Sequence, residues 1–169
     1  MTLPISPIVV GISRRTGSID ALRWAVAEAQ LRNAPVLAIT AWRGPRTPAA
    51  PGGRPPAVTL DSPDELFAKE AERIAEQLTT AVGELEPLGV HYSLRRGAAS
   101  SVLLTAAVGA QLLVLDSPRS GALSTLAKSL IAPQVIFKAP CPVVVMPPPI
   151  AGADDVVPTG GLTSTPDPV

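Results

Sequence analysis

The sequence predicts an α/β domain in which five parallel strands alternate with four helices. The first indication is the stretch 111–146, where two short apolar runs, at 112–115 and 143–146, flank a loop and a helix. Both runs are too short for core helices and are predicted to be strands buried on both faces, so the stretch is a βαβ unit. The second indication is that the same order of strand, loop and helix recurs through 5–43 and 62–147.

Length, charge and cysteine content narrow the class of protein. The chain has 169 residues, enough for one domain of ordinary size, and its 14 basic and 14 acidic side chains cancel. Because no net positive field is present, neither nucleic acid nor an anionic membrane is expected as a partner. A single cysteine cannot form an internal disulfide and no signal-peptide pattern is seen, so we expect a cytoplasmic protein. No apolar run approaches the roughly 20 residues of a membrane span.

The first two strands and the helix between them are predicted within residues 7–42. Residues 7–12 (PIVVGI) are apolar, and 19–32 repeats apolar side chains at helical spacing after a polar loop. Ser18 is the predicted N-cap of this helix. Residues 35–42 (PVLAITAW) predict a second buried strand, parallel to the first because a helix connects the two.

Two proline-rich segments are predicted to lie outside the packed body. They are the insertion at 44–63 and the tail at 148–169, which hold most of the 20 prolines of the chain. Such segments favour extended or flexible chain, so the domain is expected to span 1–147 around the insertion. The insertion is expected to be a disordered segment, and two alternatives remain for it: a lid over the sheet edge, or a segment that binds a protein partner, a role also open to the tail.

The second helix has the clearest start signal in the chain. Ser62 and Glu65 form a capping box around a proline at the first helical position. Its apolar stripe is predicted to continue to residue 85. Residues 90–94 then alternate apolar and polar side chains, which is typical of a strand at a sheet edge.

The remaining elements continue the alternation of strands and helices. Residues 99–108 predict a third helix, with Ser100 or Ser101 as its cap. The strand at 112–115, a helix that ends near Lys138 and the last apolar run complete the pattern.

Over residues 5–147 these segments resemble the universal stress protein family. The resemblance rests on six motifs in family order: IVVGI at 8–12, GSIDALRWAVAEA at 17–29, PVLAITAW at 35–42, RRGAASSVLLTAA at 95–107, AQLLVLDS at 110–117 and KAPCPVVVM at 138–146. It implies the adenine nucleotide alpha hydrolase-like fold, a parallel sheet in the order 3-2-1-4-5 with helices on both faces. It also implies a role in stress survival, and a dimer formed through the final strand. One branch of the family binds ATP and the other does not.

The residues that hold ATP in the first branch are replaced here. The family uses an aspartate after the first strand, three glycines after the fourth and a final hydroxyl, positions that fall on Ser13, Asp116, Arg119, Ser129 and Leu130. Gly121 is a glycine nearby, outside the pattern. Asp116 would repel a phosphate, and added side chains prevent close backbone approach. The resemblance therefore implies a stress protein with no ATP cofactor bound in the family manner.

Arginines suggest an alternative. Six of the eleven lie at predicted carboxyl ends of strands, the edge where parallel sheets bind ligands: Arg14, Arg15, Arg43, Arg95, Arg96 and Arg119. One hypothesis is a rebuilt site that holds an adenine nucleotide or another anion by guanidinium groups. The other is that these are solvated loops whose arginines pair with Asp61 and Asp116.

Catalysis is not expected, but dimer formation is. With one histidine, His91, and one cysteine, Cys141, the chain offers no metal-ligand spacing and no Cys/His pair, and no general base can be assembled. His91 is predicted to be a structural or surface residue, and Cys141 to be a small apolar residue. The strand at 142–146 is expected at a bare sheet edge, which predicts a homodimer through this strand and monomers when Val144 is changed to lysine.

Overall fold

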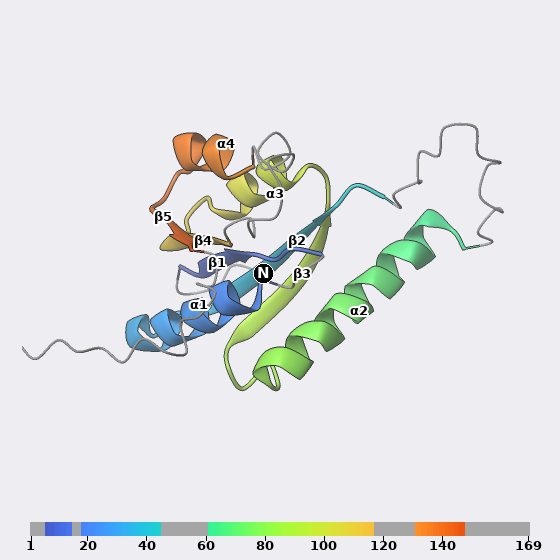
Figure 1. Ribbon diagram of the computed structural model, residues 1–169, viewed down its shortest axis with the longest axis horizontal. Coiled ribbons are helices and arrows are strands. Elements are labelled where there is room, and N and C mark those ends of the chain that lie inside the picture. The colour runs from blue at the N-terminus through green and yellow to red at the C-terminus, as the bar shows by residue number, and fades with distance from the viewer. Residues whose placement is uncertain (1–5, 15–17, 45–60, 117–130, 148–169) are drawn as a thin grey trace, which may run out of the picture.

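The computed structural model describes residues 6–14, 18–44, 61–116 and 131–147, in which strands and helices alternate along the chain (Figure 1). The strands are β1 (Ile8–Gly11), β2 (Val36–Trp42), β3 (Val90–Arg96), β4 (Leu112–Asp116) and β5 (Val143–Met146). The helices are α1 (Ile19–Arg32), α2 (Pro63–Val82), α3 (Ala99–Ala106) and α4 (Ile131–Lys138). The sheet order is β3-β2-β1-β4-β5 and every neighbouring pair is parallel, which confirms the predicted fold class and strand order.

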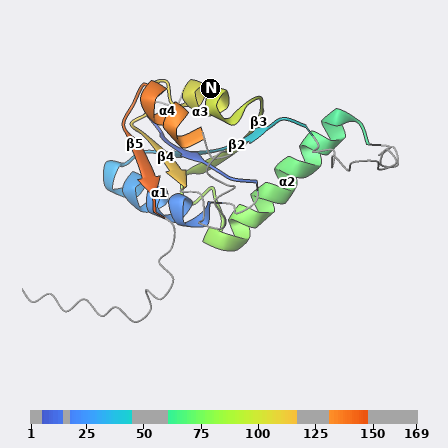
Figure 2. The ribbon, with the colours of Figure 1, turned by 45° about the horizontal axis from the view of Figure 1, so that its top comes forward.

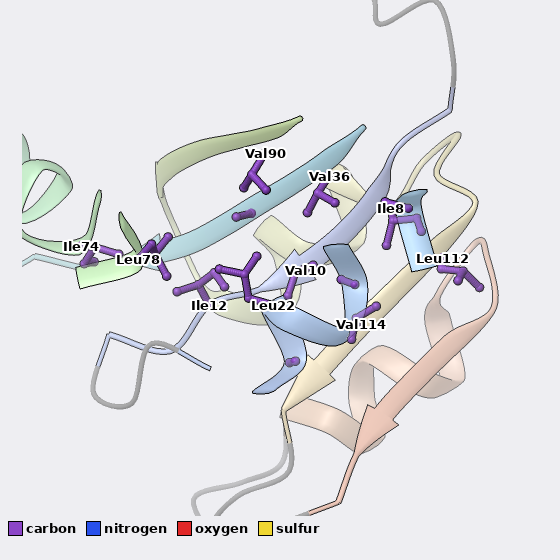
Figure 3. Packing of buried hydrophobic residues seen from close by; sticks show 14 of the residues in the cluster. Ile8, Val10, Ile12, Leu22, Val36, Ile74, Leu78, Val90, Leu112 and Val114 are labelled. Atoms are coloured by element: carbon purple, nitrogen blue, oxygen red, sulfur yellow. The ribbon is translucent and has the colours of Figure 1, made fainter. Parts of the chain in front are cut away.

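Helices cover both faces of the sheet, α1 and α2 on one and α3 and α4 on the other (Figure 1). Alternate residues of one strand show the two layers: Ile8 and Val10 pack on the side of α1 and α2, whereas Val9 packs on the side of α3 and α4. Leu22 of α1 and Leu78 of α2 complete the first layer, which Figure 3 shows from close by. Burial of each such side chain stabilises the fold by roughly 1.5–3 kcal/mol.

The start of α2 agrees with its sequence signal, and its end does not. The Glu65 amide donates to Ser62 Oγ at 3.2 Å, and the Ser62 amide donates to Glu65 Oε2 at 2.6 Å, so the capping box is confirmed. The helix ends at Val82 and not near residue 85, because Gly83 adopts a φ of 91° and donates its N–H to the Thr79 carbonyl. Leu85 still packs against the first layer from the turn that follows.

The start of α3 differs from the prediction. Its N-cap is Ala98, which makes no side-chain cap hydrogen bond, so the prediction that Ser100 or Ser101 caps the helix is wrong. β3 pairs with β2 as far as Arg96, two residues past the predicted end of the strand, and Gly97 then turns the chain at a φ of 136°. The helix therefore begins before it reaches either serine.

β5 is exposed on one side, so the prediction that it is buried on both faces is wrong. It pairs with β4 alone and is the last strand on its side of the sheet (Figure 2). Val145 is 39% exposed, and the other residues of β5 are partly exposed. At the opposite edge β3 lies as expected, with His91 exposed. Among the described residues, no helix is both long and apolar enough to cross a membrane.

Candidate functional site

The loop after β1 is held by a hydrogen bond between two serines. The Ser13 amide donates to Ser18 Oγ at 3.1 Å. Ser18 occupies the N-cap position of α1, as predicted, but its backbone is left-handed at a φ of 46° and its side chain does not cap the helix. Its buried hydroxyl fixes the turn instead, so the loop that carries Ser13 and Arg14 has a defined path at the carboxyl edge of the sheet.

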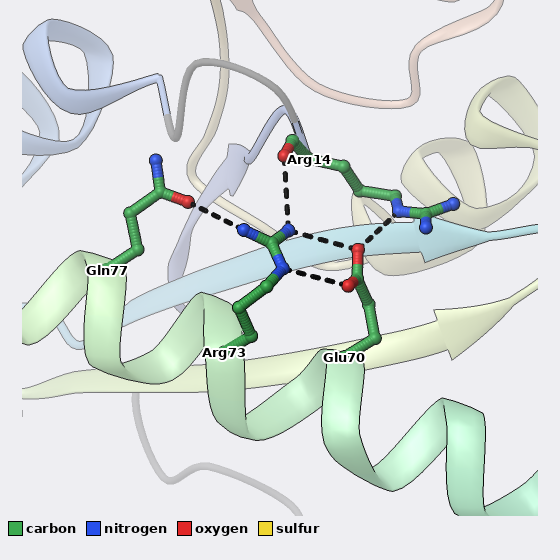
Figure 4. A network of polar contacts seen from close by, with 4 residues as sticks. All are labelled: Arg14, Glu70, Arg73 and Gln77. Carbon is green, nitrogen blue, oxygen red and sulfur yellow. Dashed lines mark hydrogen bonds and ion pairs between the residues drawn. The ribbon is translucent and has the colours of Figure 1, made fainter. Parts of the chain in front are cut away.

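Arg14 connects this loop to α2 through a network of polar side chains (Figure 4). Its Nε donates to Glu70 Oε1 at 2.6 Å. Arg73 grips the same carboxylate at two points, with Nε 2.9 Å from Oε2 and Nη2 3.1 Å from Oε1. Arg73 also donates to the Arg14 carbonyl at 3.2 Å and to Gln77 Oε1 at 3.4 Å. One carboxylate of α2 therefore binds two guanidinium groups.

This network holds more positive charge than negative charge. The bonded Arg73 lowers the pKa of Glu70 most; partial burial opposes that fall, and Arg14 adds to it. The hydrogen bond to Glu70 in turn raises the pKa of Arg73. Because all three groups are ionised at neutral pH, two positive charges face one negative charge, and the network carries one net positive charge at the sheet edge.

Two buried hydroxyls lie on β2 and β3, on the face that α2 covers. Thr40 is 1% exposed, and neither its hydroxyl nor that of Tyr92 has a hydrogen-bond partner within the part of the chain that the structure describes. Burial raises the pKa of Tyr92, and the nearby Thr40 hydroxyl lowers it to a smaller extent. The two hydroxyls do not meet the geometry of a hydrogen bond. The charges of Glu70, Arg73 and Arg14 also act on Tyr92, which places this hydroxyl close to the network.

Arg96 belongs to a separate cluster at the ends of β2 and β3. Its guanidinium lies 5.0 Å from the ring centroid of Trp42 and 4.6 Å from that of Phe67, and it forms an ion pair with Asp64. The two rings meet edge to face at 5.3 Å. This cluster ties the first turn of α2 to the sheet, so the role of Arg96 is structural.

The predicted site residues are only partly described. Arg15, Arg119, Gly121, Ser129 and Leu130 lie outside the described residues, as do most of the insertion and all of the tail. Asp116 ends β4 and is partly exposed. Arg95 faces the opposite side of the sheet from Arg96, as successive strand residues do, and Arg43 is exposed.

The described arginines therefore do not converge on one point. The expectation that Asp61 pairs with an arginine is wrong, because its partner is Lys69 at 2.8 Å. The carboxylates that do pair with Arg14 and Arg96 come from α2, an element from which the sequence suggested no site residue.

The residues of α2 that form the network around Arg14 were missed at the level of sequence. Glu70, Arg73 and Gln77 are spaced by three and four residues, so they follow one flank of the buried stripe that Ile74 and Leu78 form. A charged flank beside an apolar stripe is a usable signal. It indicates which helix face meets polar residues of the sheet edge, although it does not identify them.

Catalytic groups do not assemble in the described residues. No cluster of three or more metal-binding side chains occurs among them. Cys141 packs partly exposed against the second layer, and burial raises the pKa of its thiol, which disfavours the reactive thiolate. The arrangement at the sheet edge is suited to binding through charge and hydrogen bonds.

Comparison with known proteins identifies the family. A model of the universal stress protein family matches residues 4–147. The chain belongs to the universal stress protein family. A universal stress protein of Mycolicibacterium smegmatis is 27% identical over 139 residues, which cover 82% of this chain and 47% of that protein. The chain thus spans about half the length of this curated relative. Universal stress proteins are generally not enzymes.

Solved structures support the same fold. A universal stress protein in complex with cAMP superposes with a TM-score of 0.56 at 17% identity, over 84% of this chain and 96% of that one. A universal stress protein of Archaeoglobus fulgidus in complex with dAMP gives 0.53 at 21% identity, over 85% and 98%. UspA of Lactobacillus plantarum gives 0.55 at 17% identity, over 86% and 100%. At these identities the likeness concerns the fold alone.

Proposed function

We propose that this universal stress protein is a non-enzymatic, cytoplasmic stress-response protein that acts by binding as a homodimer and does not bind ATP in the family manner. The observation that carries the proposal is the open edge at β5. Pro142 accepts a hydrogen bond from Leu113 of β4, so the alternation of a parallel ladder directs the amide and carbonyl groups of Val143 and Val145 outward. A second copy of the chain would pair with these groups.

Apolar side chains beside β5 support this partner. On α4, Phe137 is 88% exposed and Ile136 is 46% exposed, and Val145 is 39% exposed. A stable interface needs about 800 Å² from each partner, more than a short strand supplies alone. α4 directly precedes β5 in the chain, and its exposed apolar side chains would add to the area buried by a self-complementary pair of β5 edges.

The proposal that ATP is not bound in the family manner is supported by residues at both ends of the expected nucleotide site. Ser13 stands where the resemblance places an aspartate, and its amide is already bonded to Ser18. Asp116 places a carboxylate at the end of β4 where a glycine is expected. A carboxylate there costs at least about 1 kcal/mol of repulsion with phosphate in a partly desolvated site.

A thermal-shift measurement with ATP, AMP and cAMP tests this part of the proposal. A ligand present at about 100 times its Kd stabilises the folded state by about 2.7 kcal/mol, which raises the Tm of a domain of this size by several degrees. We expect millimolar nucleotide to give no shift beyond that of inorganic phosphate at the same concentration. A rise of several degrees with ATP that phosphate does not give would contradict the proposal and favour the alternative, a stress protein that binds an adenine nucleotide at its arginines.

The observation that favours this alternative is Arg14. It lies at the sheet edge in a network with net positive charge. The relatives solved with cAMP and dAMP show that proteins of this fold bind adenine nucleotides. The alternative does not depend on the dimer.

A further inference from the structure

Arg14 presents unused hydrogen-bond donors at the carboxyl edge of the sheet. Only its Nε contacts Glu70, at 2.6 Å, and its two terminal amino groups point away from the carboxylate (Figure 4). Within 6–14, 18–44, 61–116 and 131–147, no residue accepts a hydrogen bond from these amino groups. The side chain is 31% exposed, so an ion from solvent can reach it.

Arg73 balances the negative charge of Glu70 and leaves the terminal amino groups of Arg14 available to a ligand. Arg73 binds both oxygens of the Glu70 carboxylate, the two-point arrangement that matches a guanidinium to a carboxylate best. The charge of Arg14 is therefore the surplus one. Arg73 also donates to the Arg14 carbonyl at 3.2 Å, so both the backbone and the guanidinium of Arg14 are fixed before any ligand arrives. A donor fixed in advance binds more tightly because less conformational entropy is lost.

A second observation concerns two hydroxyls on β2 and β3, on the sheet face that α2 covers. The Tyr92 hydroxyl is buried and has no hydrogen-bond partner among the described residues, and the nearby Thr40 hydroxyl is in the same state. A buried hydroxyl without a partner costs about 1–3 kcal/mol. Thr40 and Tyr92 thus leave hydrogen-bonding capacity unused on the α2 side of the sheet, close to the network.

We propose that Arg14, held in place by Glu70 and Arg73, is the anchor of a binding site for a phosphate-type oxyanion on the α2 side of the sheet edge. The two terminal amino groups donate to two oxygens of the anion, a geometry that a guanidinium provides and an ammonium does not. The site differs in place from the glycine loop of the family, which follows β4 on the other side of β1 in the sheet order. It deepens the anion-binding alternative and is independent of the dimer.

Calorimetric titration with inorganic phosphate tests the inference. We expect Arg14→Ala to weaken phosphate binding at least about tenfold, a change of about 1.4 kcal/mol. The matched control is Arg32→Ala, which removes an arginine that is also ion-paired at 2.6 Å, to Glu28 on α1, and which should leave the affinity unchanged. If Arg14→Ala does not fold, Arg14→Lys keeps the charge, loses the two-point contact and should also weaken binding.

Three results would overturn this site: no binding of phosphate by the parent protein at millimolar concentration, the same affinity in the parent and both Arg14 variants, or an equal loss in Arg14→Ala and Arg32→Ala. A monomeric protein that still binds phosphate through Arg14 would refute the proposed dimer and leave this site intact.

Discussion

At the scale of the residue, Glu70 is the carboxylate that two arginines from different segments share. It joins α2 to the loop after β1 through Arg14 and is 15% exposed, with Arg73 bonded to both of its oxygens. Removal of a partly buried carboxylate leaves two guanidinium groups facing each other without a counter-charge. The residue that organises the sheet edge thus lies on a helix and not in a strand-end loop.

We therefore predict that Glu70→Gln lowers the free energy of unfolding by about 1 kcal/mol at neutral pH, because the arginines are partly exposed and solvent screens them. The folded-state pKa of Glu70 is below its ordinary value of 4.5, so its contribution is complete above that value and is lost as pH falls through the folded-state pKa. Urea unfolding from pH 7 to pH 3 should show parent and variant converge. Glu72→Gln, an exposed change on the same helix, is the control. A difference that stays constant with pH would contradict the prediction.

The same residues show what a sequence conveys about a site. The five predicted departures from the ATP motif come from the chain itself, because each is a residue type at a counted position. The contact between Arg14 and Glu70 spans 56 positions and depends on where α2 lies on the sheet. No local pattern contains that information. Arginines that the sequence places together at the carboxyl ends of the strands therefore lie in different clusters in the structure.

At the scale of the element, the prediction that depends on residues close in sequence is correct, whereas those that depend on contacts between distant segments are wrong. The start of α2 was correct because its cap lies within four residues of sequence, at Ser62 and Glu65. The start of α3 was wrong because the length of β3 is set by pairing with β2, a contact between distant segments. The predicted burial of β5 on both faces was wrong because an apolar run does not show how completely distant segments cover a strand, and Val145 is left 39% exposed.

The cap of α2 can be tested directly. Ser62→Ala removes the acceptor of the Glu65 amide and should lower the free energy of unfolding by about 1 kcal/mol. Ser101→Ala is the matched control, since Ser101 lies exposed inside α3, where alanine favours the helix, and its stability should not fall. Chemical unfolding of the three proteins measures both changes. An equal loss in the two variants would show that the capping hydrogen bond is not the cause.

At the scale of the whole molecule, the two edges of the sheet have opposite character. α2 lies beside the β3 edge, and β5 lies at the opposite edge (Figure 2). α2 forms ion pairs with Arg14 and Arg96, whereas Val145 of β5 and Phe137 of α4 are exposed apolar side chains. The proposed anion site on Arg14 lies at the carboxyl ends of the strands, and the proposed dimer interface is the β5 edge, so the two would use different surfaces.

The dimer gives the prediction at this scale, and the structure changes which residue tests it. Val144 packs against the first layer of the core, so a lysine there would disturb folding, whereas Val145 is 39% exposed. We expect the parent to be a dimer in light scattering and Val145→Lys to be a monomer with an unchanged circular dichroism spectrum, because a charge on an edge strand blocks pairing. Ala68→Lys, an exposed change on α2 at the other edge, should remain dimeric. A parent protein that is monomeric at micromolar concentration, or a dimer that survives Val145→Lys, would show that the β5 edge is not the interface.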